Sequence, residues 1–185
     1  MKFKEVKMLL KRIENTADEL FLKAFDLCEA SFPYEERRDL DELLRVMKNS
    51  DYHFCVLLEG EELCGIVLYW ETDSFIYLEH LATDPQKRNH GFGSKALELL
   101  GQKGKVIILE IEPPLDELTR RRLGFYQRNG YTAVPCRHIQ AKYHEGDPDV
   151  VLTILSAPYA IDQKTYDEFN RYLQRYVGFG ANRNF

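Results

Sequence analysis

The stretch LEHLATDPQKRNHGFGSKALELL, residues 78–100, determines the fold that we predict from this sequence. An apolar segment leads into a polar loop, and two glycines, Gly91 and Gly93, then open an amphipathic helix that runs to Leu100. The first backbone N–H groups of a helix lack partners within the helix, and the helix dipole favours negative charge there. Glycines let such groups approach an anion closely, although they also serve ordinary tight turns. The pattern therefore predicts a strand, a phosphate-binding loop and a helix.

Basic side chains in and around this loop strengthen the prediction of an anion site in an acidic chain. They are Lys87, Arg88, His90 and Lys95. Two other phosphate loops are excluded, because no GxxxxGK[ST] run occurs and Ala96 stands where the GxGxxG pattern needs a third glycine.

Upstream of this stretch, hydrophobic periodicity and turn residues predict two helices and four strands. A first strand is expected within residues 3–13, followed by a helix that starts at a capping box of Thr16 and Glu19 and ends before Pro33. A second helix is expected after Asp39. The remaining strands are expected at 52–58, 63–71 and 75–83, the first two forming a hairpin.

Downstream, we expect alternating strands and helices. They are a helix over 91–100, a strand over 105–111, a helix over 115–129, strands over 132–143 and 149–156, and a last helix over 162–177. The order β-α-α-β-β-β-α-β-α-β-β-α predicts one α/β domain. We expect residues 1–160 to form that domain and 161–185 to be a helical extension packed on it.

The composition is that of an ordinary folded domain. The 185 residues are 44% hydrophobic and 30% charged, and 25 Lys and Arg against 30 Asp and Glu give a formal charge of −5. Disorder and a nucleic-acid partner are therefore not expected. No secretory signal is expected, because MKFKEVKMLLKRIEN at the start has no apolar core followed by a small-residue cleavage site. No membrane partner is expected either, because no uncharged apolar run reaches about 18 residues. Four separate cysteines without a CxxC pair predict reduced thiols and a cytoplasmic location.

No metal site and no serine hydrolase is expected. The five histidines lack the paired spacing of metal ligands, and neither HExxH nor GxSxG occurs. These histidines are His53, His80, His90, His138 and His144.

Two motifs resemble those of one known family. The run Arg88-Asn89-His90-Gly91-Phe92-Gly93 resembles the R/Q-x-x-G-x-G/A acyl-CoA loop of the GCN5-related N-acetyltransferase (GNAT) superfamily. Further on, GFYQRNGY at 124–131 resembles the helix-to-strand motif F-Y-x-x-x-G-F/Y of that family. The two motifs stand in the same order as in the family, with a predicted strand between them, and the resemblance covers roughly residues 5–157.

The resemblance implies a mixed, mostly antiparallel sheet flanked by helices, in which two parallel strands, 75–83 and 105–111, splay apart to hold the pantetheine arm of acetyl-CoA. No metal is implied. Tyr126 matches the family tyrosine beside the CoA sulfur, which implies a proton donor to the departing thiolate. The alternative is an aromatic residue that only packs. The residues implied to bind the co-substrate are Leu81, Ala82, Thr83, Arg88, Asn89, His90, Gly91, Phe92, Gly93 and Ser94.

Acetyl transfer also calls for a base, because an alkylamine has a pKa of about 10. Glu79 lies in an apolar strand, where an unpaired carboxylate is costly and a raised pKa would suit a base. The alternative is a structural ion pair, for example with an arginine. Strand alternation predicts Tyr77, Glu79 and Leu81 on one face and His80 on the other.

Glu110 is the rival base. The segment Leu109-Glu110-Ile111 resembles an L-E-V segment that carries the base in some protein N-terminal acetyltransferases, although the spacing to Tyr126 is longer here.

We therefore expect an N-acetyltransferase that moves an acetyl group from acetyl-CoA to a primary amine of a small molecule or a peptide, by direct attack in a ternary complex. The alternative is a non-catalytic module that senses acyl-CoA. In SFPYEERR (31–38), Phe32, Tyr34, Glu35 and Glu36 would recognise a hydrophobic or cationic acceptor, or else would only end a helix. The aromatic stripe of the last helix predicts core packing, with a homodimer contact as the alternative.

Overall fold

A computed structural model of the protein describes residues 7–179 and 181. The first half of the chain forms β1 (Met8–Arg12), α1 (Leu20–Ser31), a 3-10 turn (Tyr34–Glu36), α2 (Leu40–Val46), β2 (Tyr52–Glu59), β3 (Glu62–Glu71) and β4 (Phe75–Thr83). The second half forms a 3-10 turn (Pro85–Lys87), α3 (Phe92–Gly101), β5 (Val106–Ile111), α4 (Glu117–Arg128), β6 (Thr132–Ala133), β7 (His138–Ile139), β8 (Val151–Ala157), α5 (Gln163–Tyr172) and a π-helical turn (Leu173–Val177).

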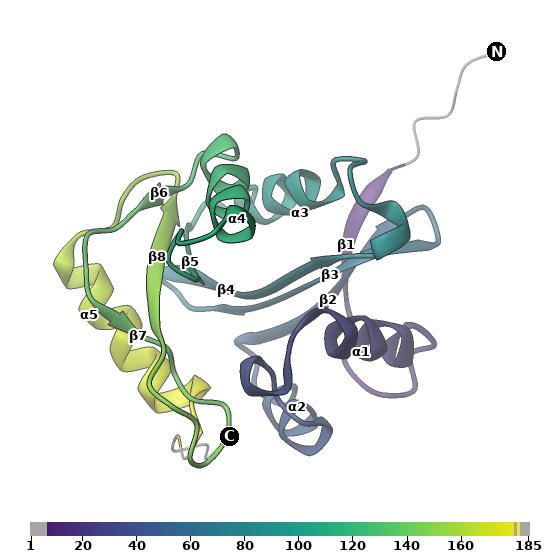
Figure 1. Cartoon of the computed structure of the whole chain (residues 1–185). Coiled ribbons are helices and arrows are strands. Elements are labelled where there is room, and N and C mark those ends of the chain that lie inside the picture. Colours follow the sequence, from purple (N-terminus) through teal and green to yellow (C-terminus); the bar gives the residue numbers. More distant parts are fainter. Residues whose placement is uncertain (1–6, 180, 182–185) are drawn as a thin grey trace.

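One mixed sheet runs through the molecule in the strand order β1-β2-β3-β4-β5-β8-β6, and β7 pairs with β8. Neighbouring strands are antiparallel except β4 and β5, which are parallel. Helices α1 and α2 lie on one side of the sheet, and α3 and α4 lie on the other (Figure 1). The predicted α/β class and mostly antiparallel sheet are confirmed.

The central strands are apolar on both faces because helices cover both sides. In β2, Phe54 and Val56 belong to the core on the side of α1, α2 and α5. The alternate residues Cys55 and Leu57 belong to the core on the side of α3. Because successive strand side chains point to opposite faces, a sheet with two cores gives nearly unbroken apolar runs.

The helix starts follow the prediction in one case and not in the other. Asp39 caps α2, since its carboxylate accepts the backbone N–H three residues on at 2.8 Å. The capping box predicted for Thr16 and Glu19 is wrong, because α1 begins only at Leu20. There the Asp18 carboxylate accepts the Leu20 N–H at 3.0 Å.

The strand predicted over 132–143 is much shorter than expected. Only Thr132–Ala133 and His138–Ile139 pair with β8. Pro135 lies between them, has no N–H for the ladder and interrupts the strand.

The C-terminal helix α5 packs against the sheet. Phe169 is fully buried, and its ring meets those of Phe75 and Tyr77 of β4 at centroid distances of 5.8 and 5.2 Å. This agrees with core packing of its aromatic stripe. The last residues of the expected extension, 180 and 182–185, and the first residues of the expected domain, 1–6, lie outside the described residues.

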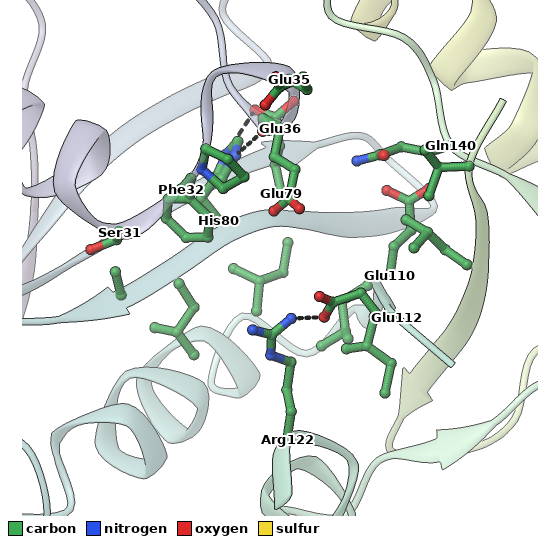
Figure 2. Close-up of a pocket in the computed structure, with 18 of the residues that line it drawn as sticks. Ser31, Phe32, Glu35, Glu36, Glu79, His80, Glu110, Glu112, Arg122 and Gln140 are labelled. Atoms are coloured by element: carbon green, nitrogen blue, oxygen red, sulfur yellow. Dashed lines mark hydrogen bonds and ion pairs between the residues drawn. The ribbon is translucent and has the colours of Figure 1, made fainter. Parts of the chain in front are cut away.

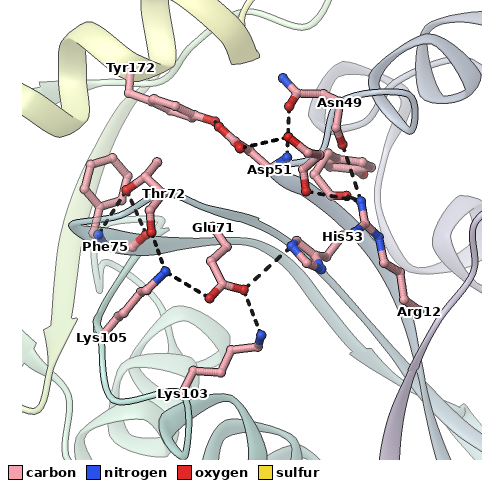
Figure 3. A network of polar contacts seen from close by, with 12 residues as sticks. Arg12, Asn49, Asp51, His53, Glu71, Thr72, Phe75, Lys103, Lys105 and Tyr172 are labelled. Carbon is pink, nitrogen blue, oxygen red and sulfur yellow. Dashed lines mark hydrogen bonds and ion pairs between the residues drawn. The ribbon is translucent and has the colours of Figure 1, made fainter.

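A polar network sets where β5 begins (Figure 3). Glu71, at the end of β3, accepts hydrogen bonds from Lys103 at 2.7 Å and from Lys105 at 3.0 Å. The segment between α3 and β5 is thereby tied to the sheet, and β5 starts beside β4 with Val106 opposite Phe75.

Candidate active site

The two parallel strands part after a short pairing. Residues 75–78 of β4 pair with 106–109 of β5, and the pairing ends at Leu78 and Leu109. Beyond that point β4 stays with β3 as far as Thr83, and β5 stays with β8 as far as Ile111. A cavity of about 390 Å³ lies here, lined by both strand ends, by residues 31–33, 35 and 36, and by side chains of α4 (Figure 2).

A β-bulge shapes the wall that β4 gives to the cavity. Neighbouring β3 residues pair with the residues on either side of Glu79, so Glu79 is an extra residue in the strand. As a result Glu79 and His80 both contact the segment before α2, through Arg38 and Glu36 respectively. The prediction that His80 lies on the opposite face from Glu79 is wrong, and Leu81 instead packs in the core on the α3 side.

Glu79 forms a buried ion pair. Its Oε1 lies 2.6 Å from Nη1 of Arg38, and the two side chains are 0% and 3% exposed. The Tyr143 hydroxyl donates to the same oxygen at 3.1 Å. Burial by itself raises the pKa of Glu79, but the charge of Arg38 and contacts with His80 and Arg38 outweigh burial and lower the pKa to about 2. The structure thus contains the arginine pair that was the alternative for Glu79, and such a carboxylate accepts protons weakly near neutral pH.

Glu110 lies on β5, across the cavity from Glu79, and belongs to a different hydrogen-bond network. Its carboxylate accepts a hydrogen bond from the Tyr77 hydroxyl and contacts Nε2 of His138. His138 is fully buried, and its Nδ1 lies 3.0 Å from the hydroxyl of Tyr166. Because that hydroxyl donates to the carbonyl of Arg137 at 3.2 Å, Nδ1 carries the hydrogen of the bond to Tyr166.

Tyr126, on α4, faces the same cavity. Burial raises the pKa of its phenol to about 12, and Arg122 nearby lowers it only in part. The ring contacts Phe125 and Tyr131 edge-on, at centroid distances of 5.1 and 5.6 Å. The hydroxyl forms no hydrogen bond within 7–179, so a protonated donor is available at the cavity.

The glycine loop joins β4 to α3, in the predicted order of strand, loop and helix. Gly91 is the N-cap of α3 with φ of 79°, a left-handed conformation that favours glycine. A Cβ on Gly93 would stand 3.1 Å from the ring of Phe125, which shows that α3 and α4 approach closely there. The residues predicted to bind the co-substrate follow one another from the end of β4, through this loop, to the first turn of α3.

The charges around the loop are fewer than the sequence suggested. Lys87 pairs with Glu62 at 2.7 Å, and Lys95 pairs with Glu98 at 2.9 Å. Arg88 has no ion pair among the described residues, and it lines the cavity. Arg88 is therefore the available cation beside the predicted phosphate site.

The segment between α1 and α2 closes one end of the cavity. Phe32, Glu35 and Glu36 line it, whereas Tyr34 stacks on His144 at 3.9 Å between ring centroids. Sequence reasoning missed Arg38, His138 and Tyr143. They carry no motif, and their partners are distant in sequence and close only in the fold.

The described residues contain neither a membrane-spanning helix nor a cluster of metal ligands. Within 7–179 and 181, no helix combines the length and the apolar character that a membrane span needs. In the same residues, no group of three or more His, Cys, Asp or Glu side chains is placed to hold a metal ion.

A mixed sheet whose parallel strands part beside a glycine loop and helix defines the acyl-CoA N-acyltransferase class of fold. Residues 50–133 match the family model of the acetyltransferase (GNAT) domain. A solved structure from Bacteroides thetaiotaomicron, described as a GNAT-family protein, is 30% identical and has a TM-score of 0.85, over 91% of this chain and 97% of the other. The chain belongs to the GNAT family, as the two motifs implied.

Two further likenesses, one over a shorter part of the chain and one at lower identity, agree with this assignment. The chain is 36% identical over 104 residues to the protein YjbC of Bacillus subtilis (strain 168), which is 54% of this chain and 52% of that protein. The chain thus spans about half the length of this curated relative. Naa50 of Arabidopsis thaliana, solved with the bisubstrate analogue CoA-Ac-MVNAL, shares the fold with a TM-score of 0.59 at 14% identity, over 83% of this chain and 100% of the other.

Proposed function

We propose that the protein is an N-acetyltransferase that moves the acetyl group of acetyl-CoA to a primary amine of a small molecule or a peptide, by direct attack in a ternary complex. The parting of β4 and β5 beside the glycine loop carries this proposal. The cavity between the parted strands would hold the thioester where the strands separate, beside Glu110 and Tyr126, which both line it. Two proteins of the same fold support an amine as the acceptor. One was solved with a CoA-peptide conjugate, and the other is an aminoglycoside 6'-N-acetyltransferase solved with coenzyme A.

Acetyl-CoA would lie along the part of β4 that no longer pairs with β5. Beyond Leu78, the side of β4 that faces β5 has no strand partner in the described part of the chain, so its backbone groups are available to the pantetheine amides. The amides at the start of α3 and the Arg88 guanidinium would hold the pyrophosphate. Residues 81–83 and 88–94 would form this site, as the sequence suggested.

The chemistry needs one proton to leave and one to arrive. The amine nitrogen attacks the thioester carbonyl, whose oxygen becomes negative and accepts a backbone N–H of the parted strand. Glu110 would receive the proton that the amine loses, directly or through water. The C–S bond then breaks, and Tyr126 would give its proton to the departing thiolate. Glu110 is preferred to Glu79 because Arg38 already holds the Glu79 carboxylate and lowers its pKa.

Comparison of two variants tests the choice of base. In an assay of CoA thiol release with a panel of amines, Glu110→Gln should lower kcat by about 10²- to 10⁴-fold, the usual range for acid–base catalysis. The loss should shrink at alkaline pH, because free amine becomes abundant there. Glu79→Gln should mainly lower stability. If Glu79→Gln alone shows the kcat loss with alkaline recovery, the two roles are reversed.

Three further features accompany this proposal and stay predictions. They are the domain boundary after residue 160, a cytoplasmic location and a homodimer.

A further inference from the structure

Two polar atoms on the cavity wall are buried without a hydrogen-bond partner in the described part of the chain. They are Oε2 of Glu79 and Nδ1 of His80, on side chains that are 0% and 5% exposed. Both residues line the cavity, and Figure 2 shows them on the β4 side of it. A buried acceptor without a partner is costly, so such atoms in native proteins call for an explanation.

Both atoms are hydrogen-bond acceptors when the His80 ring is neutral. Nε2 of His80 lies 2.8 Å from the carbonyl of Glu36, and since a carbonyl only accepts, Nε2 carries the ring hydrogen. Nδ1 then presents a lone pair in the neutral ring. It lies 3.8 Å from Oε2 of Glu79, too far for a hydrogen bond between the two. A single group with two or more N–H donors can satisfy both atoms.

The charge at this end of the cavity favours a cation. Arg38 offsets the charge of Glu79, but the carboxylates of Glu35 and Glu36 line the same end and have no ion pair within the described ranges. Two of the basic residues that line the cavity are already paired with carboxylates, Arg122 with Glu112 and Lys142 with Asp149. An ammonium group, with three donors and a positive charge, matches this end better than a neutral donor.

We propose that Glu79 and His80 form a subsite for a second amino group of the acceptor, so that the substrate class is a compound with two amino groups. This rests on the proposed acetyl transfer: one amine reacts beside Glu110, while the other donates to Glu79 Oε2 and His80 Nδ1. The bulge in β4 is what makes the subsite, because regular alternation would turn His80 to the other face.

The experiment compares diaminoalkanes with alkylamines of the same carbon number, from propane to pentane, by CoA thiol release. Charge-assisted hydrogen bonds typically discriminate by about tenfold to hundredfold, so the wild-type kcat/KM should favour one diamine over its monoamine by that factor. His80→Gln offers an amide N–H to the Glu36 carbonyl but lacks the acceptor at Nδ1. In this variant the preference should fall toward one, chiefly through a higher KM for the diamine.

His144→Gln is the matched control. The Nε2 of His144 also contacts backbone carbonyls, of Tyr34 at 2.9 Å and of Arg37 at 3.0 Å, but His144 does not line the cavity. This variant should keep the diamine preference of the wild type. Thermal unfolding followed by circular dichroism shows whether each variant is folded.

Three outcomes separate the proposals. A wild-type enzyme that turns over monoamines and diamines equally overturns the subsite and leaves acetyl transfer standing, and this holds even if His80→Gln does not fold. A diamine preference that survives in folded His80→Gln also overturns it, and assigns the two acceptors to water. If no amine releases CoA thiol, the proposed function fails as well.

Discussion

Replacing Glu79 by glutamine should remove a pH-dependent part of the stability of this protein. The Glu79 carboxylate is fully buried against Arg38, and its pKa is lowered from an ordinary 4.5 to about 2. A carboxyl whose pKa is lower in the folded state stabilises the fold above its unfolded pKa. That contribution is lost as the pH falls from about 4.5 to about 2.

The size follows from the two pKa values. The interval from 4.5 to about 2, at about 1.4 kcal/mol per pH unit, corresponds to about 3 kcal/mol at neutral pH. A similar figure applies to a buried ion pair that loses one partner, about 3–5 kcal/mol, because the remaining charge is left uncompensated. We therefore expect Glu79→Gln to lose about 3 kcal/mol of unfolding free energy at neutral pH and about 1 kcal/mol near pH 3, where the folded Glu79 carboxyl is still mostly ionised.

Urea unfolding followed by tryptophan fluorescence measures this. Trp70 is the only tryptophan in the chain, is fully buried, and has the Arg38 guanidinium 5.6 Å from its ring centroid. Other carboxyls titrate in both proteins, so the difference between wild type and variant isolates Glu79. Glu35→Gln, at an exposed carboxylate, is the control and should stay within about 0.5 kcal/mol of the wild type. A gap between wild type and Glu79→Gln that is equal at neutral pH and near pH 3 would refute the reasoning.

Two further changes test the co-substrate side. Tyr126→Phe keeps the ring and removes the proton, so kcat should fall by about 10²- to 10⁴-fold while acetyl-CoA affinity and thermal stability hold; full kcat would show that Tyr126 only packs. Gly91→Val should weaken acetyl-CoA binding in calorimetry, because valine is strained at φ of 79° and its side chain would hinder the approach of the phosphates to the loop amides. Gly104→Val is the control for strain alone, because Gly104 has φ of 74° and lies just after the C-terminal end of α3, away from the loop. Equal acetyl-CoA affinities in the two variants would argue against the phosphate loop.

Much of the fold could be predicted because local signals agreed with each other. The strands 52–58 and 63–71 and the loop before α3 combine apolar runs, turn residues and glycines that each indicate the same structure. The composition of segment 132–143 predicts a strand. In the structure Pro135 interrupts it, and only Thr132–Ala133 and His138–Ile139 pair with β8. The predicted start of α1 is wrong because the carboxylate of Asp18, and not the side chain of Thr16, accepts the first backbone N–H of the helix, that of Leu20.

The site could be predicted only where a motif marks it. Glu79, Glu110 and Tyr126 do line one cavity, but nothing in the sequence places Arg38 beside Glu79 or His138 beside Glu110. Every side chain after a β-bulge points to the opposite face of the sheet from the one that regular alternation predicts. A bulge arises from how two strands pair rather than from any single residue type. The face predicted for His80 from strand alternation is therefore wrong, because His80 directly follows the bulged residue Glu79.

The most direct test of the central claim is the mass of the acceptor after incubation with acetyl-CoA and the wild-type protein. The account predicts a product heavier by one acetyl group, with one CoA thiol released for each acetyl transferred, on at least one amine of a panel that includes diamines and peptides. Calorimetric binding of acetyl-CoA with no acetylated product on any amine would contradict it, and would instead describe a protein that senses acyl-CoA.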